Sequence, residues 1–151
     1  MSDAPDMETI QHHWPEIENA SLVHAFFGKY PSLHDTEVIE IRLNRELGFD
    51  FSGPKIFMTM FIFDSLMAPD DPSRKNAQLD LTFAGVEVDK INGFNHQNPL
   101  SEFYLRKYQC PRLNQTRWEI EFGEMGLHVH FTARSITVTG LVPFQPEDYF
   151  R

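Results

Sequence analysis

Four ionisable side chains in the C-terminal third have a spacing that could support metal binding. Glu119 and Glu121 are two residues apart, and so are His128 and His130. Residues two apart on a β-strand share a face, so a hairpin joining these segments would bring the carboxylates opposite the imidazoles. Both groups are ligands of zinc and of other transition metals. The alternative, which we expect, is a set of cross-strand ion pairs on a solvated or partner-binding face, with no bound metal or other cofactor.

The register of this hairpin follows from its apolar positions. If the loop 123–126 joins the strands symmetrically, three residues of the first strand face three of the second: Ile120 faces Val129, Glu121 faces His128 and Glu119 faces His130. Ile136 and Val138 continue the same alternation, which predicts a third strand facing Phe131 and Val129. Ala133 and Arg134, however, are poor residues for a tight turn before that strand.

A serine, a histidine and an aspartate lie close together at Ser32, His34 and Asp35, which raises the question of a catalytic triad. Adjacent residues on an extended chain point in divergent directions, so one short segment cannot form the relay of nucleophile, base and orienting acid. We interpret these side chains as hydrogen-bonding backbone groups between the helix and the first strand. We therefore predict no catalytic residue and no enzyme.

The segment 93–99, with the sequence GFNHQNP, is rich in hydrogen-bonding side chains. One interpretation is a ligand site in which the amides hold the ligand and His96 acts as an acid or base. The other is a buried connection whose side chains satisfy its own backbone, with Phe94 anchored in the core. We expect the second, because no carboxylate or cysteine within the segment supplies a nucleophile or a metal ligand.

The elements that must position these residues are mostly strands. Apolar residues predict strands near 39–43, 56–63, 79–83, 86–91, 103–105, 118–122, 127–131 and 136–138. The run 56–63 is apolar on both faces, so this strand should be central. One helix is predicted over 16–27, closed by Gly28 and Pro31. The fold class is therefore α+β, a mostly antiparallel sheet of about seven to eight strands with one N-terminal helix packed on it.

Length and composition limit the organisation of the chain. Its 151 residues are close to the usual length of one domain, and we assign 17–151 to a single α+β domain. Residues 1–16 form an acidic segment that we expect to be partly disordered or laid over the domain. Cys110 is the single cysteine, and the first residues do not resemble a secretory signal, so we expect a cytoplasmic protein.

The charge balance restricts the class of partner. Lys and Arg number 13 against 22 for Asp and Glu, which gives a formal net charge of -9. This charge repels phosphate backbones, so we expect no nucleic-acid partner. The longest apolar run is far shorter than a membrane helix, so we expect no membrane partner. An acidic chain suits a basic protein surface. The composition leaves open whether the chain is a monomer or a homodimer.

Two short motifs resemble the immunity protein 50 family of bacterial polymorphic toxin systems. The first motif contains Ser32, His34, Asp35 and Glu37, and the second contains Gly93, Phe94, Asn95, His96, Gln97 and Asn98. The resemblance extends from about Phe26 to Val142 and leaves out the acidic N-terminal segment. It implies an α+β immunity protein that binds a toxin in the cytoplasm and catalyses nothing. It assigns no role to individual motif residues, which we expect to be structural.

Partner-binding residues are expected among exposed acidic side chains, because an acidic inhibitor gains association rate and complementarity against a basic toxin. The candidates are Glu87, Asp89, Glu119, Glu121 and Glu124. Two alternatives stay open. One is a small metal-dependent enzyme or metal-binding protein that uses the clustered His, Asp and Glu residues, and the other is an interaction scaffold for another protein. An immunity protein should present a broad acidic face, whereas an enzyme should gather those polar groups in a cleft.

Overall fold

Nine strands, one α-helix and two short 3-10 helices make up the part of the chain that the computed structural model describes, which is residues 6–45, 53–63, 74–95, 98–124 and 126–144. The strands are β1 (Glu8–Thr9), β2 (Glu37–Asn44), β3 (Lys55–Ile62), β4 (Asn76–Ala84), β5 (Glu87–Asn92), β6 (Glu102–Cys110), β7 (Gln115–Glu124), β8 (Leu127–Ala133) and β9 (Ser135–Phe144). The helix is α1 (Ser21–Phe27), and the 3-10 helices are Ile10–His12 and Trp14–Glu16. The predicted α+β class is confirmed.

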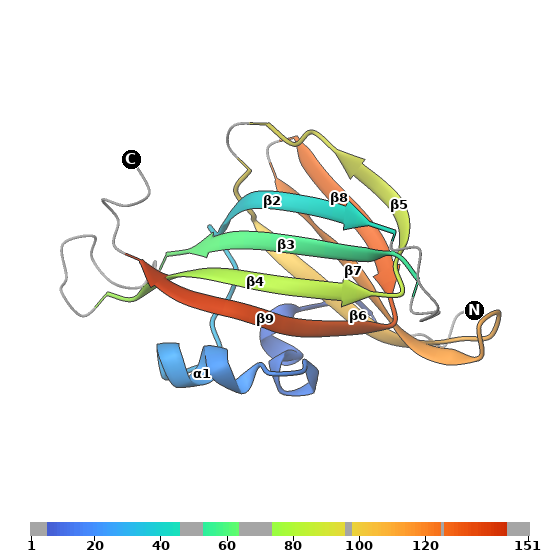
Figure 1. Cartoon of the computed structure of the whole chain (residues 1–151), viewed down its shortest axis with the longest axis horizontal. Helices are drawn as coiled ribbons and strands as arrows, with labels where there is room; N and C mark the ends of the chain where they lie inside the picture. The colour runs from blue at the N-terminus through green and yellow to red at the C-terminus, as the bar shows by residue number, and fades with distance from the viewer. Residues whose placement is uncertain (1–5, 46–52, 64–73, 96–97, 125, 145–151) are drawn as a thin grey trace.

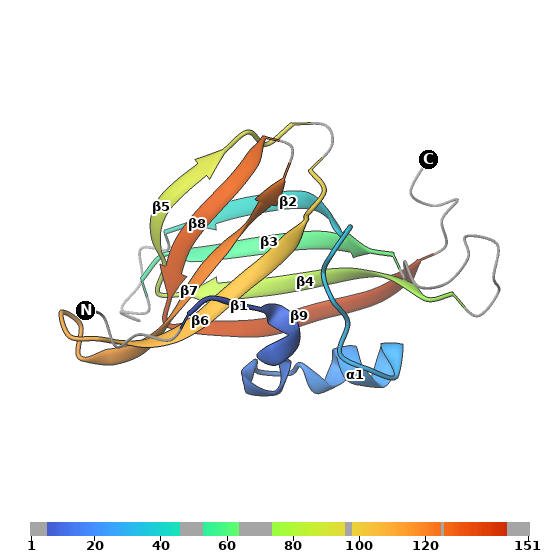
Figure 2. The same ribbon diagram turned by 180° about the vertical axis from the view of Figure 1, so that it is seen from behind.

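The strands form two antiparallel sheets that pack face to face (Figure 1). Sheet A has the order β1-β6-β7-β8-β5, and sheet B has the order β2-β3-β4-β9. Figure 2 shows sheet A from the other side, with α1 beside the edge formed by β9. β3 lies between β2 and β4, so the prediction of a central strand at 56–63 is confirmed.

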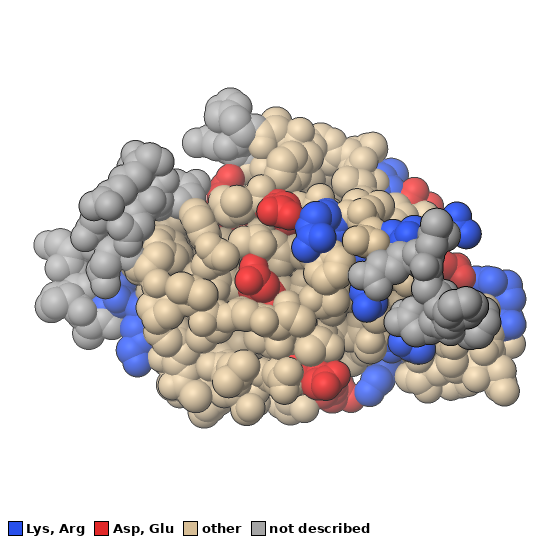
Figure 3. All heavy atoms as spheres, in the orientation of Figure 1, with Lys and Arg blue, Asp and Glu red and all other residues tan. Residues whose placement is uncertain are grey.

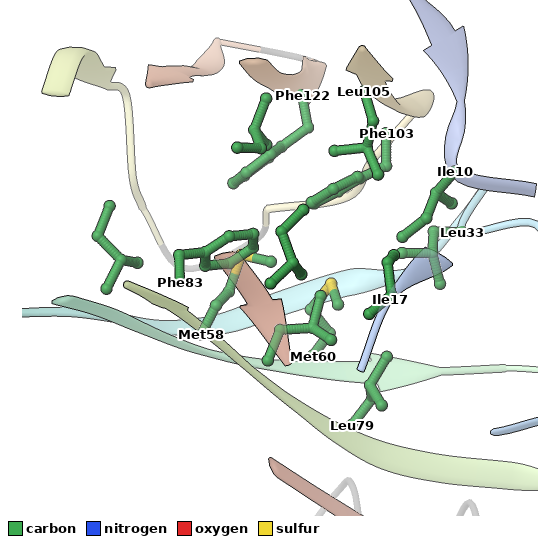
Figure 4. Packing of buried hydrophobic residues seen from close by; sticks show 14 of the residues in the cluster. Ile10, Ile17, Leu33, Met58, Met60, Leu79, Phe83, Phe103, Leu105 and Phe122 are labelled. Atoms are coloured by element: carbon green, nitrogen blue, oxygen red, sulfur yellow. The ribbon is translucent and has the colours of Figure 1, made fainter. Parts of the chain in front are cut away.

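The core lies between the two sheets, where each strand buries alternate residues. β3 and β8 follow this alternation along their lengths, so their buried side chains point into the sandwich and the others point outward. Phe83 of sheet B meets Phe131 of sheet A edge to face, with ring centroids 4.9 Å apart. Phe103 stacks on Phe122 with centroids 4.8 Å apart (Figure 4). The contact of Phe83 with Phe131 joins the two sheets, while the stacked pair Phe103 and Phe122 lies within sheet A on its buried face.

The segment 6–20 lies over the domain, and the helix starts later than predicted. β1 pairs with β6, and Ile10 and Trp14 are buried in the common core. Asn19 has a left-handed backbone conformation, with φ of 64°, which interrupts the predicted helix. The regular helix therefore begins at Ser21, and it ends at Gly28, whose φ of 75° is typical of a helix C-terminus.

The third strand predicted after the C-terminal hairpin is present as β9, but its predicted pairing partner is wrong. β9 pairs with β4 in sheet B and not with β8 in sheet A. The chain passes from one sheet to the other at Arg134, whose backbone N–H donates to Ala84 O at 2.8 Å. The poor turn chemistry of Ala133 and Arg134 corresponds to this crossing. Ile136 and Val138 are still buried in the common core, as their alternation predicts.

Trp14 gives a test of whether the N-terminal segment belongs to the cooperative fold. Its side chain is fully buried, and its indole N–H donates to Pro31 O at 2.8 Å. We expect Trp14→Ala to lower the free energy of unfolding by about 3–5 kcal/mol, because it leaves a cavity and an unpaired carbonyl. Urea unfolding measures this loss. Leu22→Ala, on the exposed side of α1, should cost about 0.5 kcal/mol or less. Equal effects of the two variants would contradict the assignment.

Candidate partner-binding face

The outer face of sheet A carries most of the acidic and histidine residues that the sequence predicted for partner or metal binding. The buried residues of β6, β7 and β8 point toward sheet B, so the alternate residues point outward. The pairing of the three strands arranges the outward residues in three rows: Glu102–Gly123–His128, Tyr104–Glu121–His130 and Arg106–Glu119–Thr132. We call this surface the A face. β5 adds Glu87 opposite Thr132, and Asp89 next to His130.

The predicted register of the β7–β8 hairpin is wrong by two residues. Ile120 pairs with Phe131, and Glu121 pairs with His130, because β7 continues to Glu124 and that residue pairs with Leu127. The connection is therefore two residues long and not four. A shift of two residues leaves every side chain on the same face.

The predicted contacts between the two histidines and the two glutamates are present, but they join diagonal neighbours and not directly opposite residues. His128 Nε2 lies 3.2 Å from Glu121 Oε2, and His130 Nε2 lies 2.9 Å from Glu119 Oε2. Diagonal neighbours on adjacent strands lie within reach of long side chains. The sequence therefore predicted the right ionic partners from the wrong register.

His130 bridges two carboxylates at the centre of the A face. Its Nδ1 lies 2.8 Å from Asp89 Oδ2, while its Nε2 lies 2.9 Å from Glu119 Oε2. Arg106 donates from Nε to the other oxygen of Glu119. A protonated imidazole donates from both ring nitrogens, so this geometry favours the charged form. The four residues form a chain of alternating charge across β5, β8, β7 and β6.

The pKa values in this network shift in the directions that the pairing requires. Burial lowers the pKa of His130, but the hydrogen bonds to Asp89 and Glu119 outweigh it and the net shift is upward. Burial raises the pKa of Glu119, but the hydrogen bonds from His130 and Arg106 outweigh it and the net shift is downward. The hydrogen bond from His130 also lowers the pKa of Asp89.

The remaining acidic candidates on the A face also have basic neighbours. Arg112 donates from Nη2 to both oxygens of Glu87, at 2.5 and 2.7 Å, and this hydrogen bond lowers the pKa of Glu87. Glu121 and His128 contact each other with 44% and 45% of their side chains exposed. The side chain of Glu124 lies outside the described part of the chain. The A face is therefore a pattern of alternating charges and not a uniformly acidic surface.

The histidines and carboxylates of the A face are arranged as ion pairs. Both ring nitrogens of His130 are directed at carboxylates of Asp89 and Glu119. Within the described ranges, no group of three or more His, Cys, Asp or Glu side chains could hold a metal ion. These ion pairs hold charged side chains at fixed positions on the surface of sheet A.

The two sequence motifs meet at the start of β2. Glu37 is buried, and its carboxylate accepts the backbone N–H of Asn98 at 2.6 Å. Asn98 donates from its amide to Val38 O at 3.3 Å and to Asn95 O at 2.7 Å. Val38 donates its backbone N–H to Asn98 O at 3.0 Å. These bonds tie the β5–β6 connection of sheet A to the first residues of sheet B.

The other residues of the first motif are exposed loop residues. Ser32 Oγ accepts the backbone N–H of His34 at 3.0 Å. His34 Nδ1 lies 3.1 Å from Asp35 Oδ2, and more than half of each side chain is exposed. Asp35 has a φ of 64°, which short polar residues tolerate in a turn. The serine hydroxyl is therefore bound to backbone and not to an imidazole.

The second motif closes the end of sheet A. Gly93 has a φ of 76°, and a Cβ atom there would lie 2.0 Å from Gly126 O, so only glycine fits. Asn95 donates its backbone N–H to Asn98 Oδ1 at 2.8 Å. The expected core position of Phe94 is wrong, because its side chain is 47% exposed at the open edge between β2 and β5. His96 and Gln97 lie outside the described residues.

Sequence analysis missed three outward residues of β6, which are Glu102, Tyr104 and Arg106. They alternate with Phe103 and Leu105, the two residues from which the strand was predicted. The same period that identifies the buried residues therefore identifies the exposed ones. What the sequence lacked was the pairing of β6 with β7, which places these side chains beside Glu119 and Glu121.

A family model described as Immunity protein 50 matches residues 19–144, which contain both motifs and β2 to β9. No curated protein and no solved structure matches the chain. None of the helices in the described residues has the length and apolar character needed to cross a membrane.

The junction of the motifs gives a second test of stability. We expect Asn98→Ala to lower the free energy of unfolding by about 1–3 kcal/mol, because it leaves buried backbone groups without hydrogen-bond partners. Urea unfolding measures the change. Ser32→Ala removes an acceptor from an exposed turn of the other motif and should cost about 0.5 kcal/mol or less. An Asn98→Ala chain as stable as the Ser32→Ala chain would contradict this role.

The His130 network should make stability depend on pH. Because the folded pKa of His130 is raised, its contribution is complete below its ordinary value of 6.5 and is lost as pH rises through the folded value. Because the folded pKa of Glu119 is lowered, its contribution is complete above its ordinary value of 4.5 and is lost as pH falls through the folded value. The network should therefore stabilise the fold most between about pH 4.5 and 6.5.

Urea unfolding of the wild type and of His130→Gln across pH 4 to 9 checks this expectation. The variant should lose about 1 kcal/mol near pH 5.5, and the difference should shrink above the folded pKa of His130. His34→Gln, in an exposed turn, controls for the loss of one imidazole. If the difference in free energy of unfolding between the wild type and His130→Gln grew from pH 6 to pH 9, His130 would be neutral in the folded chain.

Proposed function

Since the chain belongs to the Immunity protein 50 family, we propose that it binds a bacterial protein toxin in the cytoplasm and blocks it without catalysing a reaction. The observation that carries the proposal is the A face, a broad sheet surface with fixed charges and exposed tyrosine. Exposed charges and aromatic side chains on a rigid scaffold are typical of protein-binding surfaces.

We assign toxin binding to the A face because four of the five acidic candidates lie on it. Glu119 and Asp89 are held by His130, and Glu87 is held by Arg112. Side chains held in one geometry lose little conformational entropy on binding, so a preorganised face binds more tightly than a flexible one. The net charge of -9 also favours a basic partner and speeds association with it.

A non-catalytic function agrees with the surroundings of the polar motifs. The Ser32 hydroxyl is bound by backbone, and the polar groups of Asn98 are used within the fold. We propose that both motifs hold the start of β2 against the β5–β6 connection. Nucleophilic catalysis would instead need the serine beside an activating base.

Growth and binding measurements test the proposal. A candidate toxin encoded beside this chain should stop growth when expressed alone, and coexpression of the chain should restore growth. The purified proteins should form a stable complex in size-exclusion chromatography. A toxic neighbour whose effect the chain does not relieve, and which forms no complex with it, would contradict the proposal.

A pair of charge reversals tests the assignment to the A face. Glu121→Lys should weaken toxin binding at least tenfold, or by about 1.4 kcal/mol, because it places a cation opposite a basic surface. Glu40→Lys is the matched control on the outer face of sheet B. Glu40 also has a basic neighbour, Arg42, and about half of its side chain is exposed, as for Glu121. Calorimetry with the purified toxin should show little change for Glu40→Lys, and equal losses would exclude the A face as the binding surface.

A further inference from the structure

We infer that a hollow at one end of the A face receives a cationic side chain, arginine or lysine, from the protein partner. This inference rests on the proposed function, since it names the part of the partner that the face binds. The hollow has a volume of about 320 Å³ and is formed where β6, β7 and β8 lie side by side. Its polar walls are Glu102, Tyr104, Glu121 and His128.

Gly123 creates the hollow. It occupies the middle of the row Glu102–Gly123–His128, so the two outer side chains face each other across a position without a side chain. The φ of Gly123 is 151°, and a Cβ atom there would lie 2.0 Å from Leu127 O. Any other residue would therefore collide with the backbone of β8. The hollow is thus a fixed consequence of how the β7–β8 hairpin closes.

The charges that line the hollow suit a cation. Two carboxylates, Glu102 and Glu121, face it. Glu121 contacts His128 at 3.2 Å and is paired across the strands with His130. Glu102 is partly buried and has no ion pair within the described part of the chain. A partly desolvated carboxylate without a cation gains more from one than a fully solvated carboxylate does.

Tyr104 adds an aromatic surface to the same wall. It is paired with Glu121 across the strands, and 37% of it is exposed. Cations bind the faces of aromatic rings, and a guanidinium can also donate to carboxylates beside the ring. Arginine and tyrosine are among the residues that contribute most to protein interfaces. The combination of ring and carboxylates therefore favours a side chain with a cationic end and an apolar stem.

A second hollow lies on the outer face of sheet B, but its carboxylates have side-chain partners. Figure 3 shows that face, where few charged side chains lie over the strands. There Glu40 is paired with Arg42 at 3.4 Å, and Arg42 lies over the ring of Phe57 at 4.3 Å. Asp80 accepts the hydroxyl of Thr59 at 2.8 Å. These carboxylates have side-chain partners within the chain, whereas none is found for Glu102 among the described residues.

Titration with a single amino-acid derivative tests the hollow without the toxin. We expect N-acetyl-arginine amide to shift the backbone amide signals of Gly123, Tyr104 and His128 in a ¹⁵N NMR spectrum, with saturation in the millimolar range. N-acetyl-citrulline amide has the same shape without the charge and should leave these signals in place. The double variant Glu102→Gln, Glu121→Gln should bind the arginine derivative at least fivefold more weakly.

Glu87→Gln is the matched control for that variant. Glu87 lies on the A face outside the hollow and is bound by Arg112, so its loss should change the affinity by less than about twofold. Urea unfolding of each variant confirms that it folds. Equal shifts with the arginine and citrulline derivatives, or undiminished binding by the double variant, would overturn the inference.

Glu102 also gives a test of whether the toxin binds in the hollow. Glu102→Gln should weaken toxin binding at least tenfold, mainly through faster dissociation, because a buried cation would lose its partner. A wild-type chain that protects cells while Glu102→Gln keeps full affinity would overturn the inference and leave the proposed function intact. A wild-type chain that fails to protect would contradict the proposed function, and the arginine titration alone would then decide whether the hollow binds cations.

Discussion

The burial of one face of each sheet against the other is the constraint on which the rest of this structure depends. Phe83 and Phe131 meet across the sandwich, and Phe103 and Phe122 fill the space beside them. Because side chains alternate along a strand, burying one set of residues forces the other set outward in fixed rows. The arrangement of charge on the A face is therefore a direct consequence of how the apolar residues pack.

The N-terminal residues complete this core although they precede the part of the chain that matches the family model. The match begins at residue 19, yet Ile10 and Trp14 are buried with the strand residues. Glu37 and Asn98 also join the start of sheet B to the β5–β6 connection of sheet A. The two sheets are thus linked by apolar packing, by the N-terminal segment and by a buried polar junction. A rigid scaffold of this kind keeps the charges of the A face in place.

The A face combines fixed charges with one unfilled position. His130 holds Asp89 and Glu119 in one geometry, so a partner would meet a preformed pattern of charge. Gly123 interrupts that pattern, since its backbone conformation leaves no room for a side chain. The same glycine therefore closes the β7–β8 hairpin and shapes the surface beside it. If the hollow binds the partner as proposed, folding and recognition both depend on Gly123.

The sequence by itself determined which residues of β3, β7 and β8 are buried, which strand is central and that Glu119, Glu121, His128 and His130 share a face. These features follow from the period of two, which a register error of two residues leaves unchanged. Only the tertiary structure decided that β9 pairs with β4, that β6 places Glu102 and Tyr104 beside Glu121, and that Phe94 is exposed. Local sequence fixes the direction of each side chain, whereas the choice of neighbouring strand depends on contacts between distant residues, which no single segment encodes.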